Sequence, residues 1–312
     1  MREVGKLFVD GRDAMLEYGI FVEKGGYKGV VQMPQFKTIE KIEWEEYDGE
    51  EADLTSPVLD AKSVTIPFCI TNVRFAEDLF AALCDKAYHT FVFSELKREY
   101  RLRMTSVGSF SSLLKLGKLQ LTFSDDFPPT PIAQPYELGQ SGIKQLGYVI
   151  DGIDFSQFGS HILKGTDESI RKAPNIRPAL NISHKTEAGL VYDEIAVPRF
   201  KAKDITVKLL IRCSDIDEFW KRYDSLFAVL TKNESRVLYF PKLDAEYECY
   251  YKSCNVQKFE ITPSGRVWCE FDVVLCCISS RPRTTYCVLI AEDGSLIITE
   301  PEEAAILFRK TF

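Results

Sequence analysis

The sequence repeats itself over a long distance, and this feature constrains the fold more than any other. The stretch FVDGRD, which contains Asp10, recurs as VIDGID around Asp151. A second stretch, PVLDAKSVTI from Pro57, recurs as PRFKAKDITV from Pro198. Both recurrences lie 141 residues after their counterparts (151 − 10 and 198 − 57). A shared offset at two distant places indicates duplication of a domain-sized unit, since stacked arrays use short units repeated three or more times.

Weaker matches continue the repeat with small shifts, as loop insertions would produce. YRLR at Tyr100 resembles YECY at Tyr247, and GKLQLTF resembles GRVWCEF. A chain of 312 residues is long enough for two domains that each bury a core. Pro and Gly mark the connection between the copies. We therefore predict a first domain over residues 1–133, a linker over 134–145, a second domain over 146–282 and a C-terminal extension over 283–312.

Hydrophobic periodicity predicts the same elements in both copies. Polar and apolar residues alternate through Lys62–Ile70 and again through the segment containing Ile205, Val207, Leu209 and Ile211, which predicts strands with one buried face. A spacing of 3.6 residues predicts helices over Val73–Cys84 and Asp215–Leu230. Asn72 and Ser214 are the expected N-cap residues.

Further strands are expected around these segments. In the first copy they are Lys6–Val9, Ile20–Val22, His89–Phe93, Arg98–Met104 and Lys118–Phe123; in the second they are Tyr148–Ile150, Arg236–Phe240, Glu246–Lys252 and Arg266–Cys276. The C-terminal segment predicts a hairpin of Tyr286–Ile290 and Leu296–Thr299 around an Asp293-Gly294 turn. The predicted class is mainly β (α+β): two tandem β-sandwich or barrel-like domains, each with one covering helix, plus the C-terminal hairpin.

Composition restricts the function. Hydrophobic residues make up 45% and charged residues 27% of the chain, values typical of a soluble globular protein. The net charge of −7 disfavours binding to the phosphates of a nucleic acid. No apolar run approaches the ~20 residues that span a bilayer, and the N-terminus carries no apolar segment typical of a signal peptide. We therefore expect no membrane partner.

The cysteines are interpreted as small buried hydrophobic residues of a protein from a reducing compartment. Their number is odd, no C-x-x-C occurs and no histidine is near any of them in sequence. They are Cys69, Cys84, Cys213, Cys249, Cys254, Cys269, Cys276, Cys277 and Cys287.

No pattern of catalytic, cofactor-binding or metal-ligating residues is found, so none is predicted. The histidines His89, His161 and His184 are far apart. The acidic run from Glu43 to Asp53 does not match a calcium loop and is interpreted as solvated charge. Other candidates have plainer interpretations. Asp125-Asp126 is expected to end a strand, Gly25-Gly26 to form a flexible hairpin or subunit-contact loop, Trp220 to lie in the core and Trp44 to be exposed.

The order of parts resembles the distal tail proteins and tail-tube domains of phages. In that family an opening strand carries an aspartate and an aromatic-glycine pair, matched by Asp10 with Tyr18-Gly19 and by Asp151 with Phe158-Gly159. A glycine-containing loop follows, matched at Gly49 and Gly189, and then an alternating strand, a helix and closing strands. Two such domains in one chain are similar to the hubs of contractile baseplates, where a trimer imitates a six-fold ring.

The resemblance implies a non-enzymatic tail protein of a phage or prophage that assembles around a DNA channel. The implied partners are further copies, as a trimer or hexamer ring, and other tail proteins, with DNA passing through without specific binding. No cofactor is implied. The implied location is the virion tail, after assembly in the host cytoplasm. The long loops Gly25–Glu51 and Gly165–Gly189 are candidate subunit contacts. The alternatives are a β-sandwich module that binds glycans or proteins, with Trp44 exposed for the purpose, and an enzyme with a site assembled from distant residues.

Overall fold

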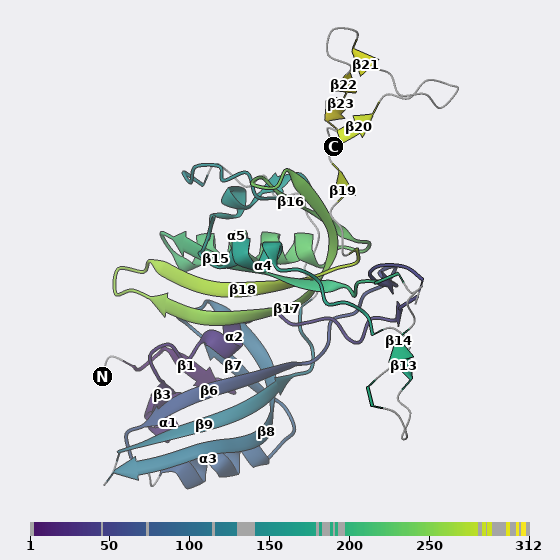
Figure 1. Cartoon of the computed structure of the whole chain (residues 1–312). Helices are drawn as coiled ribbons and strands as arrows, with labels where there is room; N and C mark the ends of the chain where they lie inside the picture. Colours follow the sequence, from purple (N-terminus) through teal and green to yellow (C-terminus); the bar gives the residue numbers. More distant parts are fainter. Residues whose placement is uncertain are drawn as a thin grey trace.

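The computed structural model describes most of the chain. It covers residues 3–279 apart from 45, 73–74, 114–115, 130–140, 179–180, 183–187, 190 and 193–196, and short strands between 283 and 309. The fold is mainly β, and its strands pair antiparallel in two large sheets and several two-stranded ones. The sheets lie one above the other in Figure 1, and we call residues 3–129 the first half and 141–279 the second half.

The first half forms one seven-stranded sheet with the order β2-β1-β7-β8-β9-β6-β3. The strands are β1 (Leu7–Val9), β2 (Arg12–Asp13), β3 (Ile20–Val22), β6 (Lys62–Ile70), β7 (His89–Phe93), β8 (Arg98–Leu113) and β9 (Leu116–Asp125). The helices are α1 (Ala14–Tyr18), α2 (Lys28–Val31) and α3 (Phe75–Cys84), and β4 (Lys41–Ile42) pairs with β5 (Glu51–Ala52) outside the sheet.

The second half repeats that order as β11-β10-β16-β17-β18-β15-β12. Its strands are β10 (Val149–Ile150), β11 (Ile153–Asp154), β12 (Ser160–Ile162), β15 (Lys203–Cys213), β16 (Arg236–Phe240), β17 (Ala245–Ile261) and β18 (Val267–Cys277). Its helices are the 3-10 helix η1 (Phe155–Phe158), α4 (Thr166–Arg171) and α5 (Ile216–Leu230), and β13 (Asn181–Ile182) pairs with β14 (Val191–Tyr192).

The halves match in their local hydrogen bonds as well as in strand order. Asp10 and Asp151 both have a positive φ, and each accepts the backbone N–H of a residue in the strand that pairs beside it, at 2.9 Å. Asp13 and Asp154 both accept backbone N–H groups at the start of the following helix. The repeated sequence therefore accompanies the same strand order and the same side-chain caps in the two halves.

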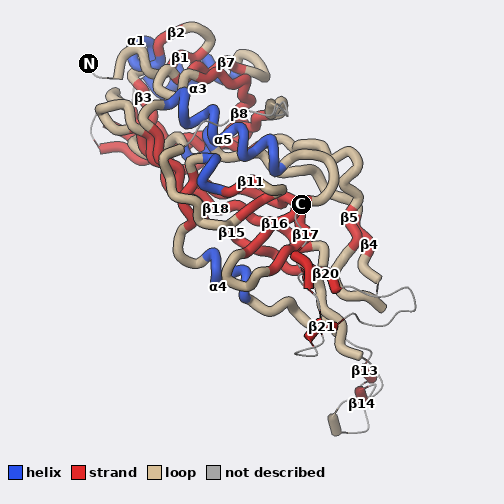
Figure 2. Tube along the Cα trace, turned by 90° about the horizontal axis from the view of Figure 1, so that it is seen from above, coloured by secondary structure: helices blue, strands red, loops and turns tan. Residues whose placement is uncertain are grey.

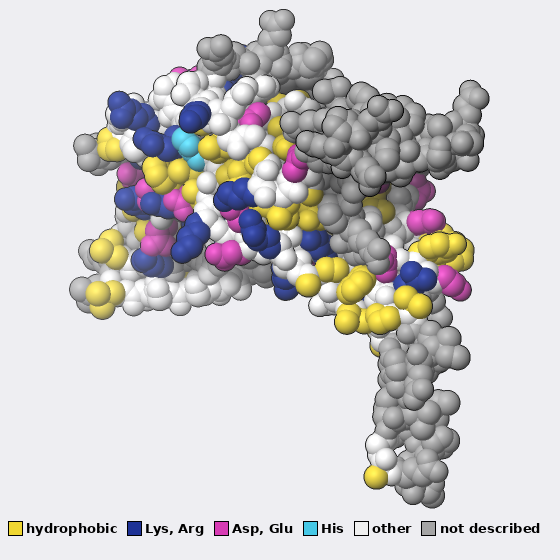
Figure 3. Space-filling model, turned by 45° about the horizontal axis from the view of Figure 1, so that its top comes forward, with side chains coloured by type: hydrophobic (Ala, Val, Ile, Leu, Met, Phe, Trp, Pro, Cys, Tyr) yellow, Lys and Arg dark blue, Asp and Glu magenta, His cyan; other side chains and the backbone are white. Residues whose placement is uncertain are grey.

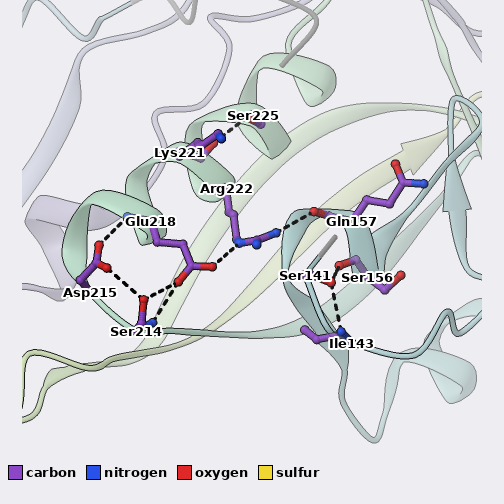
Figure 4. A network of polar contacts seen from close by, with 10 residues as sticks. All are labelled: Ser141, Ile143, Ser156, Gln157, Ser214, Asp215, Glu218, Lys221, Arg222 and Ser225. Carbon is purple, nitrogen blue, oxygen red and sulfur yellow. Dashed lines mark hydrogen bonds and ion pairs between the residues drawn. The ribbon is translucent and has the colours of Figure 1, made fainter. Parts of the chain in front are cut away.

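The two longer helices occupy equivalent places, α3 between β6 and β7 and α5 between β15 and β16. The predicted N-cap of α5 is wrong by one residue, because the Asp215 carboxylate accepts the Glu218 N–H at 2.8 Å while Ser214 lies just outside. Figure 4 shows this network continuing through Glu218 to Arg222, which donates to the Gln157 carbonyl at 3.0 Å. These bonds fix α5 against η1. α3 begins at Phe75, and the residues before it lie outside the described part of the chain.

Three details differ from the predictions. Each half carries three helices rather than one, because the segments after β2, β3 and their counterparts form short helices. β8 and β17 extend far beyond Met104 and Lys252. The predicted C-terminal hairpin is wrong in its pairing, because β20 (Tyr286–Val288) pairs with β23 (Leu307–Arg309) while β21 (Ile298–Thr299) pairs with β22 (Ala304–Ala305). β19 (Arg283–Thr284) pairs with β17, and the Asp293-Gly294 turn lies outside the described residues.

Candidate interaction surface

Side chains of the second half donate hydrogen bonds to the backbone of the first. Trp220 Nε1 donates to the Leu96 carbonyl at 2.7 Å, and the Tyr223 hydroxyl donates to the Val31 carbonyl at 3.1 Å. Both donors lie on α5, which Figure 2 shows from above. The apolar residues of both halves form one continuous buried cluster. A buried carbonyl that receives a donor avoids the cost of desolvation, so these contacts hold the halves together specifically.

Charged groups border these contacts and have a consistent polarity. Arg98 of the first half pairs with Asp224, and its guanidinium lies 3.5 Å from the centre of the Trp220 ring. Lys97 pairs with Asp217. Basic residues of the first half therefore face acidic residues of α5.

The acidic run does not behave as predicted, because part of it is buried against the second half. The Glu50 carboxylate accepts from Lys41 at 2.9 Å and from the Tyr250 hydroxyl at 2.7 Å. Asp48 accepts the backbone N–H of Phe200 at 2.9 Å. The expectation of a solvated charge run is wrong at these positions, because partners from distant strands compensate the desolvation.

A cavity of about 500 Å³ lies between the halves and contains the most deeply buried ammonium group. Burial lowers the pKa of Lys62 to about 8, although Asp125 opposes this shift. Burial raises the pKa of Asp125, with Lys62 opposing. Lys62 donates to the carbonyls of Val30 and Gln32 at 2.8 and 3.0 Å, so this ammonium supports the end of α2.

The surface of the first half that meets α5 and β17 has an uncovered counterpart in the second half. Each half has such a surface, which we call its front surface. In the first half it consists of α2, residues 32–36 and the β7–β8 turn. In the second half it consists of α4, residues 172–176 and the β16–β17 turn. Leu96 and Leu243 occupy the same place in the two turns, yet Leu96 is 0% exposed and Leu243 is 42% exposed. Val31 is buried, while its counterpart Arg171 is exposed.

The opposite surface shows the reverse asymmetry. Each half also has what we call its back surface. In the second half it consists of α5 and the apolar row of β17, namely Tyr251, Cys254 and Val256. In the first half it consists of α3 and the row of β8, namely Met104, Val107 and Phe110. Strand register fixes the equivalence, because Phe110 pairs with Leu119 and Val256 with Phe271, at matching places in the two sheets. Val256 is 4% exposed beneath the first half, whereas Phe110 is 51% exposed. One front and one back surface are thus engaged, and one of each is open.

The histidines and tryptophans noted in the sequence have separate surroundings where the structure describes them. His89 is buried, with Nδ1 2.7 Å from an Asp10 carboxylate oxygen, and supports the turn after β1. His161 lies on β12 and His184 lies outside the described residues. Trp220 is buried and Trp44 is exposed, and both predictions are confirmed.

The remaining candidates have structural roles. Asp125 ends β9 as predicted, and hydrogen bonds led by that from Arg103 hold the pKa of Asp126 at about 2. Gly25-Gly26 lies in the turn that leads into α2, where a Cβ at Gly26 would meet Val22 at 2.7 Å; a flexible hairpin or subunit-contact loop here stays a prediction.

Most cysteines behave as predicted. Six are buried, namely Cys213, Cys249, Cys254, Cys269, Cys276 and Cys277; Cys69 is partly buried. The prediction is wrong for Cys84, which is exposed at the end of α3. Cys287 lies in β20, where burial is not described.

Among the described residues, no three His, Cys, Asp or Glu side chains are placed to hold a metal ion. Within the same part of the chain, no helix is long and apolar enough to cross a membrane. The face in Figure 3 carries basic, acidic and apolar side chains intermixed, rather than a continuous field of one sign. The distinctive feature is the pair of open surfaces.

Comparison with known proteins gives a weak structural likeness. No family model matches the sequence, and no curated protein matches it. The chain is similar to the solved structure of the Dit protein of SPP1, described as a paradigm of the hub adsorption apparatus in phages that infect Gram-positive bacteria. Identity is 13%, the TM-score is 0.32, and the match covers 87% of this chain and 97% of that chain. A likeness of this size carries no argument about function.

Proposed function

We propose that the chain is a structural component of a phage or prophage tail, of the distal-tail, tube or baseplate-hub type, and that it assembles into a ring around the path of the DNA. The observation that supports this proposal is the duplicated sheet: two sheets with one strand order, joined through a shared core and carrying open surfaces at both ends. The sequence resemblance to tail-tube domains supplies the context. We propose the boundaries 1–133 and 146–282 for the two domains.

A structural role accounts for the position of charged groups at the junction of the halves. The buried Glu50 and the half-exposed Asp224 pair across the junction of the halves, and the buried Lys62 lies beside it. Contacts between two different surfaces of repeated units lead to closed rings or to filaments.

The direct test is to locate the protein in particles. Antibody-gold labelling of particles released by the cells that encode this chain should mark one end or the length of the tail in electron micrographs. Deletion of its gene should give particles without complete tails. Complete, infectious tails formed without the protein would contradict the proposal.

A second candidate is a binding module for glycans or proteins. It is favoured by Trp44 and Tyr47, which are both exposed in the segment between β4 and β5. Aromatic faces of this kind stack on sugar rings. Binding on a glycan array that disappears with Trp44→Ala, but persists with Ile42→Ala, would support this candidate.

A further inference from the structure

The two open surfaces are counterparts of the two surfaces that already bind each other within the chain. The front surface of the first half covers the back surface of the second through Leu96, Val31 and their neighbours. The front of the second half and the back of the first are left over. Their equivalence rests on strand register and on repeated hydrogen bonds, so it does not depend on the proposed role in a tail.

From this pairing we infer that copies of the chain associate head to tail, with the front surface of the second half of one copy docking on the back surface of the first half of the next. The occupant of each open surface is therefore a second copy of this chain. The inference deepens the proposed function and names the subunit contact, but it stands on the internal repeat alone.

The back surface of the first half has the chemistry of an uncovered interface. Val107 and Phe110 lie on the same face of the sheet as Leu121 and Leu119, which are their pairing partners on β9 and are buried. Their counterparts Cys254 and Val256 are also buried, in the cluster that the two halves share, and Cys254 lies 3.8 Å from the Tyr223 hydroxyl of α5. Apolar side chains exposed on the core side of a sheet favour burial by a partner.

The front surface of the second half retains apolar residues at its rim. Leu243 and Ile176 are both exposed, and they stand where Leu96 and Phe36 contact the second half. Phe36 packs edge-on against Tyr251 of β17, with ring centres 5.8 Å apart. A following copy would bring Ile176 to the corresponding place on β8.

The open surfaces carry opposite charges at other positions than the internal ion pair, since Ala245 stands where Arg98 does. Within the chain, Arg98 of a front surface pairs with Asp224 of a back surface. Arg171 and Lys172 are exposed on the open front surface, and Glu77 and Asp78 are exposed on α3 at the open back surface. Opposite charges on the two surfaces accelerate their encounter and oppose front-to-front or back-to-back contact.

Head-to-tail contact between different surfaces makes a prediction that a two-fold dimer does not. The variant Val107→Glu/Phe110→Glu disables the back surface, and Ile176→Glu/Leu243→Glu disables the front surface. In sedimentation or light scattering of the full chain, the unmodified protein should form oligomers of three or more copies. Each variant alone should be monomeric, and a 1:1 mixture should form a dimer that grows no further.

The mixture also shows that the variants are folded, because only folded surfaces can recognise each other. Ile42→Glu provides a matched control, since it places the same charge at another exposed apolar residue, on β4, and should assemble like the unmodified protein. The inference is overturned if the unmodified protein stays monomeric up to its solubility limit, if the variants assemble normally, or if their mixture stays monomeric. Labelling of tails together with any of these outcomes would refute the contact and leave the proposed function standing. Head-to-tail assembly without tail labelling would support the contact and contradict the proposed function.

Discussion

Lys62 and Lys203 occupy the same place in the two halves and donate equivalent hydrogen bonds, but they differ in burial. Lys62 donates to the carbonyls of Val30 and Gln32 at 2.8 and 3.0 Å, and Lys203 donates to the equivalent carbonyls of Ile170 and Lys172, at the end of α4, at 2.7 and 3.5 Å. Lys62 is buried beside the second half, whereas Lys203 is only partly buried. The junction of the halves therefore changes the environment of a repeated residue, and this change is measurable.

The buried ammonium should make stability depend on pH in the alkaline range. Burial lowers the pKa of Lys62 to about 8, while the unfolded chain keeps this proton until about 10.5. Between these values the unfolded state binds more protons, so stability rises with pH. The free energy of unfolding in urea, taken as the unmodified protein minus Lys62→Met, should grow by about 1–2 kcal/mol from pH 7.5 to pH 9.5. Lys203→Met should show less change, and parallel pH curves for the unmodified protein and Lys62→Met would contradict the burial argument.

The hydrogen bonds across the junction should contribute more than those in surface turns. The Tyr251 hydroxyl is buried and donates to the Pro34 carbonyl at 2.9 Å. Tyr251→Phe leaves that carbonyl without this donor and should lower the free energy of unfolding by about 1–3 kcal/mol. Tyr239→Phe is the control, since its hydroxyl donates to Asp244 in a partly exposed turn. If both variants lost the same free energy of unfolding in urea, the hydrogen bond at the junction would contribute no more than the one in the turn.

Alternation of polar and apolar residues was enough to predict β6 at its observed bounds, Lys62–Ile70, and helical spacing predicted α5 to within one residue. The same signal failed for β8, because its distal part is exposed and interrupted by register shifts between Met104 and Ser106 and between Val107 and Phe110. A bulge displaces the side-chain period by one residue, so no alternation remains to be recognised.

The candidate surfaces were beyond sequence reasoning for a different reason. The repeat predicted two equivalent units, but which surface of one covers the other depends on contacts between residues far apart, such as Tyr250 and Glu50. Glu50 stands in an acidic run that is typical of a solvated loop. Its burial depends on a partner 200 residues away as well as on the nearby Lys41, and the sequence pattern does not reveal the distant one.

Glu50 should consequently be sensitive to substitution, in contrast with its neighbour Glu51. Burial raises the pKa of Glu50, but the hydrogen bonds from Lys41 and Tyr250 outweigh it and lower that pKa. A lowered pKa stabilises the fold above about 4.5, and this contribution is lost as pH falls through the folded value. Glu50→Gln should cost about 1–3 kcal/mol at pH 7 and less below pH 4 in urea unfolding, while the exposed Glu51→Gln should cost little. A constant difference across this range would contradict the role of the charge.

Alanine substitutions at two matched glycines can distinguish backbone strain from steric crowding at the junction of the halves. Gly49 and Gly189 have φ values of +87° and +102°, so alanine is strained at both positions by about 1–2 kcal/mol. A Cβ at Gly49 would lie 2.0 Å from the Ile278 carbonyl oxygen, whereas none of the described atoms lies within 4 Å of a Cβ at Gly189. Gly49→Ala must therefore displace its loop from the second half, and it should lose about 1–3 kcal/mol more than Gly189→Ala in thermal or urea unfolding. Hydrogen exchange at the Glu50 N–H, which donates to the Ile278 carbonyl at 2.9 Å, should accelerate only in Gly49→Ala. If both variants lost the same stability and kept the same exchange, the loop would not be held by close packing against Ile278, and the junction would depend on α5 and α2 alone.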